Sequence, residues 1–294
     1  MTVLRIGARG SDLSRIQVDI VRDALTRADP GIETEFIPIS TKGDLDRESP
    51  LESGTGWFTT AIQQSLTRGE IDIAVHSYKD LPTKRPDGLV IAAVPARADP
   101  RDALVSQGNV HLRDLPPGTR VGTGSPRRRA QVLAVNPDVT VESIRGNVET
   151  RLRKVMSGEY DAAVLALAGI QRLGLESAVS QVLGLEEMLP APAQGALAVE
   201  CRASDSATLT ILRSIDVPEL RATVAAERSF LARLEAGCDF PAAAAAEVFG
   251  TTLKLNALIA PDGRIVRSKI GGAVAHASGL GASLADELLR LSES

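Results

Sequence analysis

Three consecutive arginines stand in the segment "VGTGSPRRRAQ", Val121 to Gln131, directly after a Thr-Gly-Ser-Pro turn. Ser125 is a good helix N-cap and Pro126 fits the first helical position, so the arginines would occupy the first turn of a helix. The N-terminus of a helix is already positive, and cations there destabilise the free helix unless an anion lies among them. The segment therefore predicts an anion-binding site.

Further polar side chains follow the predicted strands, where ligands bind in open α/β sheets. The residues in such positions are Arg9, Ser11, Lys79, Asp80, Thr123, Ser125, Arg127, Arg128, Arg145, Arg151 and Arg172. A single arginine is best interpreted as a solvated surface charge. Five or more at strand exits, in a chain of net charge −4, indicate a cleft for a ligand with several anionic groups. The chain has no G-x-x-x-x-G-K-[ST] phosphate loop, which favours carboxylates.

A carboxylate enters the same predicted cleft from the segment "AVHSYKDLP", Ala74 to Pro82. A predicted buried strand ends there, with His76 near its end, and Lys79 and Asp80 follow it. On a purely structural interpretation, His76 is a hydrogen-bonded core residue and Asp80 caps the next turn. Amid so many arginines, however, Asp80 would stay ionised and would stabilise a cationic intermediate. Asp80 is therefore the candidate catalytic residue.

The two cysteines, Cys201 and Cys238, cannot form a disulfide framework, and the three histidines show no metal-ligand spacing. We therefore expect no structural metal. Cys201, in "AVECR", is typical of a small buried side chain. Cys238, in "LEAGCDFP", lies in a turn after a predicted helix, where a thiol is accessible for covalent attachment.

Composition limits the class of protein. The chain has 294 residues, of which 44% are hydrophobic and 24% charged, enough for sizeable cores in two or three domains. The negative net charge and the 3% of aromatic residues argue against nucleic-acid binding. No apolar run is long enough for a membrane span, and "MTVLRIGARG" lacks a signal-peptide core, so we expect a cytoplasmic protein without a membrane partner.

The elements that position these groups alternate between strands and helices, which predicts parallel or mixed sheets covered on both faces. In the first half we expect strands at Val3 to Ala8, Ile32 to Ser40, Ile71 to Ser77 and Leu89 to Pro95, and helices at Asp12 to Arg27 and Trp57 to Arg68. A second set repeats this architecture, with a strand before Gly122, the arginine helix, a strand at Val139 to Ile144, a helix at about Asn147 to Met156 and the strand "YDAAVLAL".

The segment "LPAPAQGALAVECR" predicts a strand that crosses back to the first lobe. From Pro218 we expect a long helix to Ala236, then a hairpin of Leu253 to Ala260 and Ile265 to Ile270 in an antiparallel sheet, and a closing helix near Ser283 to Leu291. The fold class is thus α/β with two doubly wound lobes and a small α+β C-terminal domain. The predicted domains are 1–97 with 195–215, 98–194, and 216–294.

Seven segments together resemble the porphobilinogen deaminase (hydroxymethylbilane synthase) family over nearly the whole chain. They are "RGSDLSRIQ", "AVHSYKDLP", "VGTGSPRRRAQ", "IRGNVETRL", "LALAGIQRLGL", "LPAPAQGALAVECR" and "LEAGCDFP". The resemblance implies two lobes like those of bilobal solute-binding proteins and a third domain. It also implies that four porphobilinogen molecules are condensed head to tail into hydroxymethylbilane, with loss of ammonia, on a dipyrromethane cofactor.

The resemblance also implies roles for single residues. Cys238 matches the cysteine that holds the dipyrromethane by a thioether bond, and Asp80 matches the catalytic aspartate, which stabilises the azafulvene cation left when ammonia departs. The residues implied to bind cofactor and substrate carboxylates are Arg9, Ser11, Thr123, Ser125, Arg127, Arg128, Arg145, Arg151 and Arg172, with Lys79 holding a nearby carboxylate and with weaker assignments for Gln17, Gln194, Gly195 and Arg202. Arg129 is expected on a solvated face, and the family implies a monomer.

One segment departs from the family pattern. Many members carry a "GGKGLF"-like loop followed by a Lys-Glu pair, whereas this chain has "LESGTGWFTTAIQQ", Leu51 to Gln64. Thr55 replaces the lysine, and Thr60 and Ala61 replace the pair. Phe58 is retained, and we expect it to close over the cleft. Two other interpretations of the chain are a non-catalytic bilobal protein that binds or senses an anion, and a family member that has lost activity through this loop.

Overall fold

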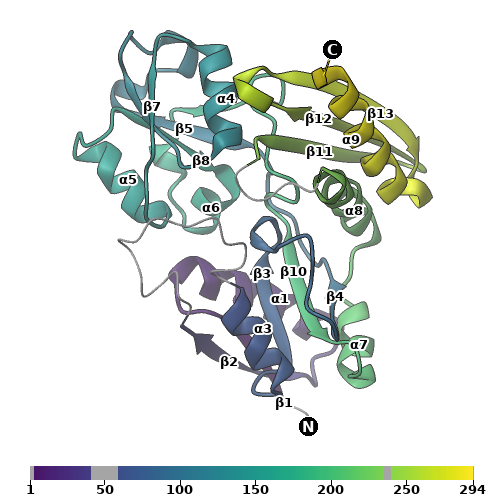
Figure 1. Ribbon diagram of the computed structural model, residues 1–294. Coiled ribbons are helices and arrows are strands. Elements are labelled where there is room, and N and C mark those ends of the chain that lie inside the picture. The colour runs from purple at the N-terminus through teal and green to yellow at the C-terminus, as the bar shows by residue number, and fades with distance from the viewer. Residues whose placement is uncertain (1–2, 41–58, 235–239, 294) are drawn as a thin grey trace. The chain divides into compact units, whose positions relative to one another are not determined.

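The computed structural model describes residues 3–40, 59–234 and 240–293 (Figure 1). These residues form three sheets. They belong to two compact units, one made of residues 1–98 and 196–221 and the other of residues 99–195 and 222–294. The predicted limits of the third domain, 216–294, stay a prediction.

The sheet of the first unit is mixed. Its strands, in spatial order, are β2 (Glu33–Ile39), β1 (Val3–Arg9), β3 (Ile73–Ser77), β10 (Leu197–Arg202) and β4 (Leu89–Ala93). β1 runs parallel to β2 and β3, and β10 runs antiparallel to both of its neighbours. The predicted strand that crosses back from the second lobe is therefore confirmed, and it lies between β3 and β4.

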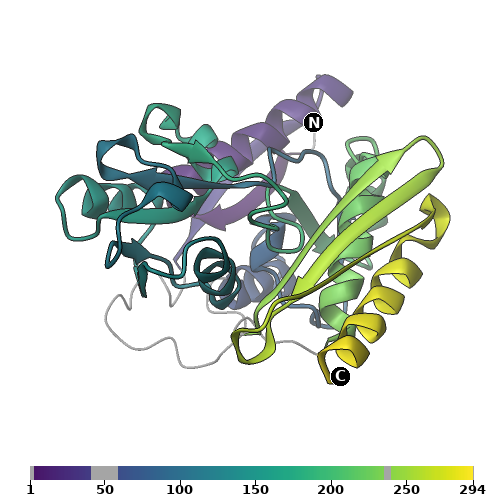
Figure 2. The same cartoon turned by 90° about the horizontal axis from the view of Figure 1, so that it is seen from above.

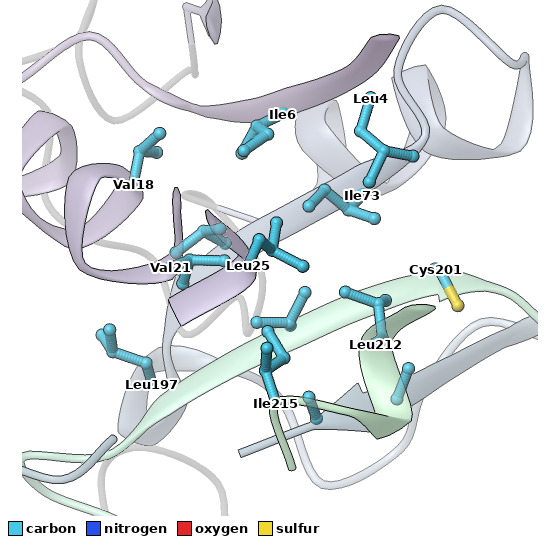
Figure 3. Close-up of a cluster of buried hydrophobic side chains, with 14 of the residues drawn as sticks. Leu4, Ile6, Val18, Val21, Leu25, Ile73, Leu197, Cys201, Leu212 and Ile215 are labelled. Atoms are coloured by element: carbon cyan, nitrogen blue, oxygen red, sulfur yellow. The ribbon is translucent and has the colours of Figure 1, made fainter. Parts of the chain in front are cut away.

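Helices cover both faces of this sheet. On one face, α1 (Asp12–Ala28) buries Val18, Val21 and Leu25, whose spacing of three and four residues puts them on one helical stripe. Figure 3 shows these side chains in one cluster with residues of the sheet and with Leu212 of α7 (Ser206–Arg213). On the other face, α3 (Thr60–Thr67) packs through a separate cluster.

Cys201 is a buried side chain, as the sequence predicted, and it belongs to the cluster that includes α1 (Figure 3). It is fully buried, and burial raises the pKa of its thiol to about 11. A thiol in this state is a poor nucleophile.

The lobe in residues 99–195 repeats the plan. Its strands are β7 (Thr140–Glu142), β6 (Arg120–Gly122), β8 (Ala162–Ala166), β5 (Asp102–Ser106) and β9 (Gln181–Val182). α4 (Pro126–Val135) contributes to the cluster on one face, and α5 (Val148–Met156) and α6 (Leu167–Arg172) to the cluster on the other. β5 runs antiparallel to β8, so Asp102 at its start lies opposite Ala166 at the end of β8.

The C-terminal part of the same unit is an antiparallel sheet of β11 (Ala242–Phe249), β12 (Thr252–Ile259) and β13 (Val266–Ala273). The predicted hairpin is confirmed. α8 (Pro218–Arg233) and α9 (Ala277–Glu293) share a cluster with one face of this sheet (Figure 2). On the other face, Ala243 and Leu258 pack against Leu189 of the 99–195 lobe.

The closing helix begins six residues before its predicted start. Two glycines, Gly279 and Gly281, lie in the added turns, and glycine disfavours helix in isolation. Here Gly281 allows α9 to approach α8 closely, because a Cβ at this position would clash with the backbone carbonyl of Ala226. Tertiary packing therefore sets this boundary.

Single 3-10 turns lie at Tyr78–Asp80, Gln107–Asn109, Leu112–Asp114, Glu176–Ala178, Pro261–Gly263 and Val274–His276. Among the helices of the described ranges, none has both the length and the apolar character needed to cross a membrane.

Candidate active site

The predicted catalytic carboxylate, Asp80, is exposed at the carboxyl end of the first unit's sheet. It closes the 3-10 turn Tyr78–Asp80, which follows β3 directly. The turn is held at its start by a hydrogen bond from Tyr78 N to Ala196 O (3.0 Å) and at its end by one from Leu81 N to Tyr78 O (3.2 Å). The backbone is thus fixed on both sides of a carboxylate that solvent reaches.

Three more predicted site residues lie at the same edge. Arg9 ends β1, which runs parallel to β3. Ser11 is the N-cap of α1, where its Oγ accepts from Ser14 N (3.3 Å). Gln17 is buried and donates to Ser77 Oγ (2.8 Å), so it supports the strand end from which the Asp80 turn begins.

His76 is a buried core residue, as its structural interpretation predicted, although its Nε2 makes no hydrogen bond within the described residues. Its Nε2 lies 3.3 Å from Oε2 of Glu200, a fully buried carboxylate on β10. Gln63 on α3 donates to both oxygens of Glu200, at 3.2 and 3.1 Å. This cluster ties α3, β3 and β10 together inside the first unit.

Arg202 does not join this edge. Because β10 is antiparallel to β3, its first residue, Leu197, pairs with Ser77, and Arg202 lies at the opposite end of the sheet. There its guanidinium contacts Asp72 (3.2 Å) and Asp205 (3.0 Å). These ion pairs give Arg202 a structural role, and we leave it out of the ligand-binding set.

In the second unit, the arginine helix has the predicted N-terminus. Ser125 is the N-cap of α4, its Oγ accepts from Arg128 N (3.4 Å), and Pro126 is the first helical residue. Thr123 Oγ1 accepts from Ser125 N (3.2 Å), which fixes the turn before the cap. Arg129 is exposed, as predicted.

Arg127 and Arg128 are both buried, and their first anionic partner is a residue of the chain itself. Arg127 Nη1 lies 2.8 Å from Asp102 Oδ2, and Arg128 Nη2 lies 2.7 Å from Asp102 Oδ1. Arg127 also donates to Leu189 O, and Arg128 Nη1 donates to Val164 O (2.9 Å). The sequence predicted an anion among these arginines but did not identify Asp102.

One carboxylate does not balance two guanidinium groups, so the buried trio carries a net charge of +1. Burial alone would raise the pKa of Asp102, but the attraction of Arg127 and Arg128 outweighs it and holds this pKa below its ordinary value. Burial lowers the pKa of Arg127, although Asp102 opposes the effect. Arg128 Nε is buried without a hydrogen-bond partner in the part of the chain that the structure describes.

Arg172, the last residue of α6, is a further cation of this lobe. Its Nη2 donates to Gly195 O (2.7 Å), and its Nε is buried with no partner among residues 3–40, 59–234 and 240–293. Burial lowers its pKa to about 10. Gly195 has a φ of 83°, which side chains other than glycine rarely adopt, so this residue presents its carbonyl to Arg172 at little conformational cost.

The other predicted residues of the lobe follow strand ends as expected. Arg145 is exposed after β7, and Arg151 on α5 donates from Nε to Gly146 O (2.8 Å). Gln194 is buried and donates from Nε2 to Asp102 Oδ1 (2.8 Å) and Pro100 O (2.7 Å). Gln194 therefore contacts Asp102, the carboxylate shared by the arginines.

Glu227 is a further buried carboxylate that the sequence analysis missed. It lies on α8, where Oε2 accepts from Ala193 N (2.7 Å) and Oε1 accepts from Ala246 N (2.8 Å). Ala193 has a φ of 64°, so Glu227 stabilises a strained backbone next to Gln194. A glutamate on the mostly apolar stripe of Val224, Ala226 and Phe230 was the available signal.

Two predicted features lie outside the described residues. They are Cys238, the predicted cofactor attachment point, and the first part of the altered loop with Thr55 and Phe58. Of that loop, Thr60 and Ala61 are described and begin α3.

Comparison with known proteins gives matches over nearly the whole chain. The model of the "porphobilinogen deaminase, dipyromethane cofactor binding domain" matches residues 4–210, and that of the "porphobilinogen deaminase, C-terminal domain" matches residues 221–290. A porphobilinogen deaminase of Roseiflexus castenholzii is 46% identical over 289 residues, which are 97% of this chain and 95% of the relative. One of Nocardia farcinica is 44% identical over 99% of this chain and 86% of the relative.

Among solved structures, substrate-binding domain 2 of Lactococcus lactis GlnP is similar with a TM-score of 0.46 and 14% identity, covering 73% of this chain and 88% of that one.

Proposed function

The chain belongs to the porphobilinogen deaminase family, and on this premise we propose how its own residues carry the reaction. The enzyme is a transferase of tetrapyrrole biosynthesis. It condenses four porphobilinogen molecules head to tail into hydroxymethylbilane and releases ammonia. The observation that carries this conclusion is the match of both family domains, over residues 4–210 and 221–290.

The carboxyl edge of the 99–195 lobe fits a dipyrromethane, whose acetate and propionate groups are anionic. The Asp102 trio has a net charge of +1, and two buried N–H groups, Arg128 Nε and Arg172 Nε, have no acceptor within the described part of the chain. A carboxylate oxygen supplies both the missing charge and the missing acceptor. Cys238 would hold the dipyrromethane by a thioether, and the bound group would supply a free pyrrole α-carbon for addition of substrate.

The other polar residues at the carboxyl edge of the 99–195 lobe also offer positive charge or hydrogen-bond donors, and we assign the whole set to cofactor and substrate carboxylates. They are Thr123, Ser125, Arg127, Arg128, Arg145, Arg151 and Arg172. In the first unit, Arg9 and Lys79 are assigned to substrate carboxylates. Ser11 caps α1 and Gln17 donates to Ser77, whereas Gln194 donates to Asp102 and Gly195 O accepts from Arg172. These four residues are assigned to supporting the groups that bind the ligand.

Asp80 is assigned the chemical step. Its carboxylate accepts hydrogen bonds from pyrrole N–H groups and stabilises the cation that forms on the substrate when ammonia departs. Two features support this role. The carboxylate is exposed, and the turn that carries it is hydrogen-bonded at both ends, so little reorganisation is needed when the cation forms.

We also propose that the enzyme acts as a monomer in the cytoplasm, as expected for a biosynthetic enzyme that uses a small-molecule substrate. Light scattering coupled to size-exclusion chromatography checks the monomer. A mass near twice 31.0 kDa would overturn it.

The test of the proposed function is porphobilinogen consumption together with the intact mass of the purified protein. We expect the added mass of a dipyrromethane in the parent chain and in Cys201→Ala, which removes a buried thiol, and no added mass in Cys238→Ala. A non-catalytic anion-binding protein would bind porphobilinogen without consuming it. An unmodified parent chain that consumes no porphobilinogen, even after incubation with excess substrate, would overturn the proposal.

A further inference from the structure

Asp102 is the only fully buried carboxylate at the carboxyl edge of the 99–195 lobe within the described residues. Its place follows from strand direction, because antiparallel β5 brings its first residue to the edge where parallel β6 and β8 end. The two oxygens have separate partners. Oδ2 contacts Arg127 Nη1 (2.8 Å), and Oδ1 contacts Arg128 Nη2 (2.7 Å) and Gln194 Nε2 (2.8 Å).

These contacts constrain both guanidinium groups. Arg128 is held through two nitrogens, Nη2 by Asp102 and Nη1 by Val164 O, whereas Arg127 contacts both Asp102 and Leu189 O through Nη1. A planar guanidinium held through two nitrogens cannot turn, so the directions of the remaining N–H groups of Arg128 are set. Arg128 Nε is one such group, and it is buried without an acceptor in the described ranges.

The net charge of +1 distinguishes the Asp102 trio from an ordinary buried ion pair. A purely structural pair would be balanced, since an unmatched charge is costly in a protein interior. Here two cations share one anion. Without Asp102, the two guanidinium groups would repel each other in a medium of low dielectric constant and would separate.

We propose that Asp102 is a positioning residue of this enzyme, which holds Arg127 and Arg128 in the orientations that receive ligand carboxylates and keeps their combined charge at +1. The proposal rests on the proposed function of the two arginines. Asp102 itself is anionic and fully buried, so it repels ligand carboxylates and acts only through its partners.

The test compares Asp102→Asn with Asp161→Asn. Asp161 is a matched control, because it also pairs with an arginine of this lobe, Arg120, but at the amino end of β8. In Asp102→Asn we expect a smaller cofactor-loaded fraction by intact mass. In the loaded enzyme we expect KM for porphobilinogen to rise at least tenfold, while kcat falls less than threefold. Asp161→Asn should keep the parental values of all three quantities.

A second comparison asks whether Asp102 acts through the arginines. Adding Asp102→Asn to an Arg127→Gln/Arg128→Gln variant should change KM by less than threefold, because the groups that Asp102 holds are already gone. Effects on KM that multiply in the triple variant would overturn the proposal. If Asp102→Asn does not fold, Asp102→Glu replaces it in the test, because this variant keeps the charge but moves the carboxylate by one methylene. Its KM for porphobilinogen should still rise. A parental KM in Asp102→Glu would overturn the proposal.

The two levels of failure are distinguishable. Parental loading and KM in Arg127→Gln/Arg128→Gln would refute the carboxylate-binding role of the arginines, and the inference with it. An impaired arginine variant beside a parental Asp102→Asn would refute the positioning role alone.

Discussion

Arg172 is a partly buried cation whose replacement should stabilise the fold while impairing the enzyme. Burial lowers its pKa from the ordinary value of 12.5 to about 10. At about 1.4 kcal/mol per pKa unit, burying this charge costs about 3 kcal/mol. The hydrogen bond from Nη2 to Gly195 O offsets about 2 kcal/mol, the usual net value for a charged donor. The expected net cost of Arg172 to folding is therefore about 1 kcal/mol.

The sign of this effect follows from the direction of the pKa shift. A base with a lower pKa in the folded chain is disfavoured in its charged form by folding. The penalty is complete below about pH 10 and shrinks as the pH rises above this value. It is therefore fully present at pH 7.5, where the measurement is made.

The change is Arg172→Met, which keeps the length of the side chain and removes its charge. We expect the cofactor-free variant to unfold at higher urea concentration, with the free energy of unfolding raised by about 1 kcal/mol and Tm raised by about 2 °C. The cofactor-free form is used because bound ligand would itself stabilise the folded state. In the same variant, cofactor loading should fall and KM for porphobilinogen should rise.

The matched control is Arg153→Met on α5. Arg153 is exposed, and its replacement should change the free energy of unfolding by less than about 0.5 kcal/mol. A loss of 1 kcal/mol or more in Arg172→Met would refute the reasoning, since it would mean that a carboxylate of the chain already balances this charge. A gain in stability with unchanged loading and KM would refute the ligand-binding role alone.

Three further predictions concern Asp80, Arg129 and Asp102. Asp80→Asn should load its cofactor normally but turn over at least about a hundredfold more slowly, because a neutral amide stabilises a cation poorly; kcat near the parental value would remove Asp80 from the chemical step. Arg129→Ala should change kcat and KM less than twofold, since Arg129 is exposed and donates to Val141 O, and a tenfold loss would contradict this. The pKa of Asp102 is lower in the folded chain, so its contribution to stability is complete above about pH 4 and is lost as the pH falls further. The difference in free energy of unfolding between the parent and Asp102→Asn, measured in urea, should be constant from pH 8 to pH 5 and shrink below pH 4; a difference that shrinks already at pH 6 would show that another group is responsible.

Local signals predicted many of the elements, although not β5, β9 or α7, and they predicted the N-terminus of the arginine helix. The Ser125 cap, the first-turn Pro126 and the exposure of Arg129 follow from propensity and helix geometry within a few residues. Asp102 could not be predicted in this way. It lies in the polar segment "ADPRDA", residues 98–103, where no local pattern indicates a site, and only the antiparallel direction of β5 brings it to Arg127 and Arg128.

Strand direction also explains the outcome for Arg202. Motif matching groups it with Gln194 and Gly195, a few residues earlier in the same segment. β10 then carries it the length of the sheet, from the end beside Ser77 to the end beside Asp72. Two residues that are close in a motif thus lie at opposite edges of the sheet when a strand lies between them. No local sequence pattern predicts the edge at which each residue lies.

The position of β10 also sets an order in which the chain can fold. Residues 1–98 do not include β10, which lies between β3 and β4. Their sheet is therefore incomplete until residue 202 has been synthesised. Residues 99–195 contain all five strands of their own sheet. During translation we therefore expect the second lobe to fold while the first waits incomplete, with unpaired edges at β3 and β4 that depend on chaperones or on rapid synthesis for protection.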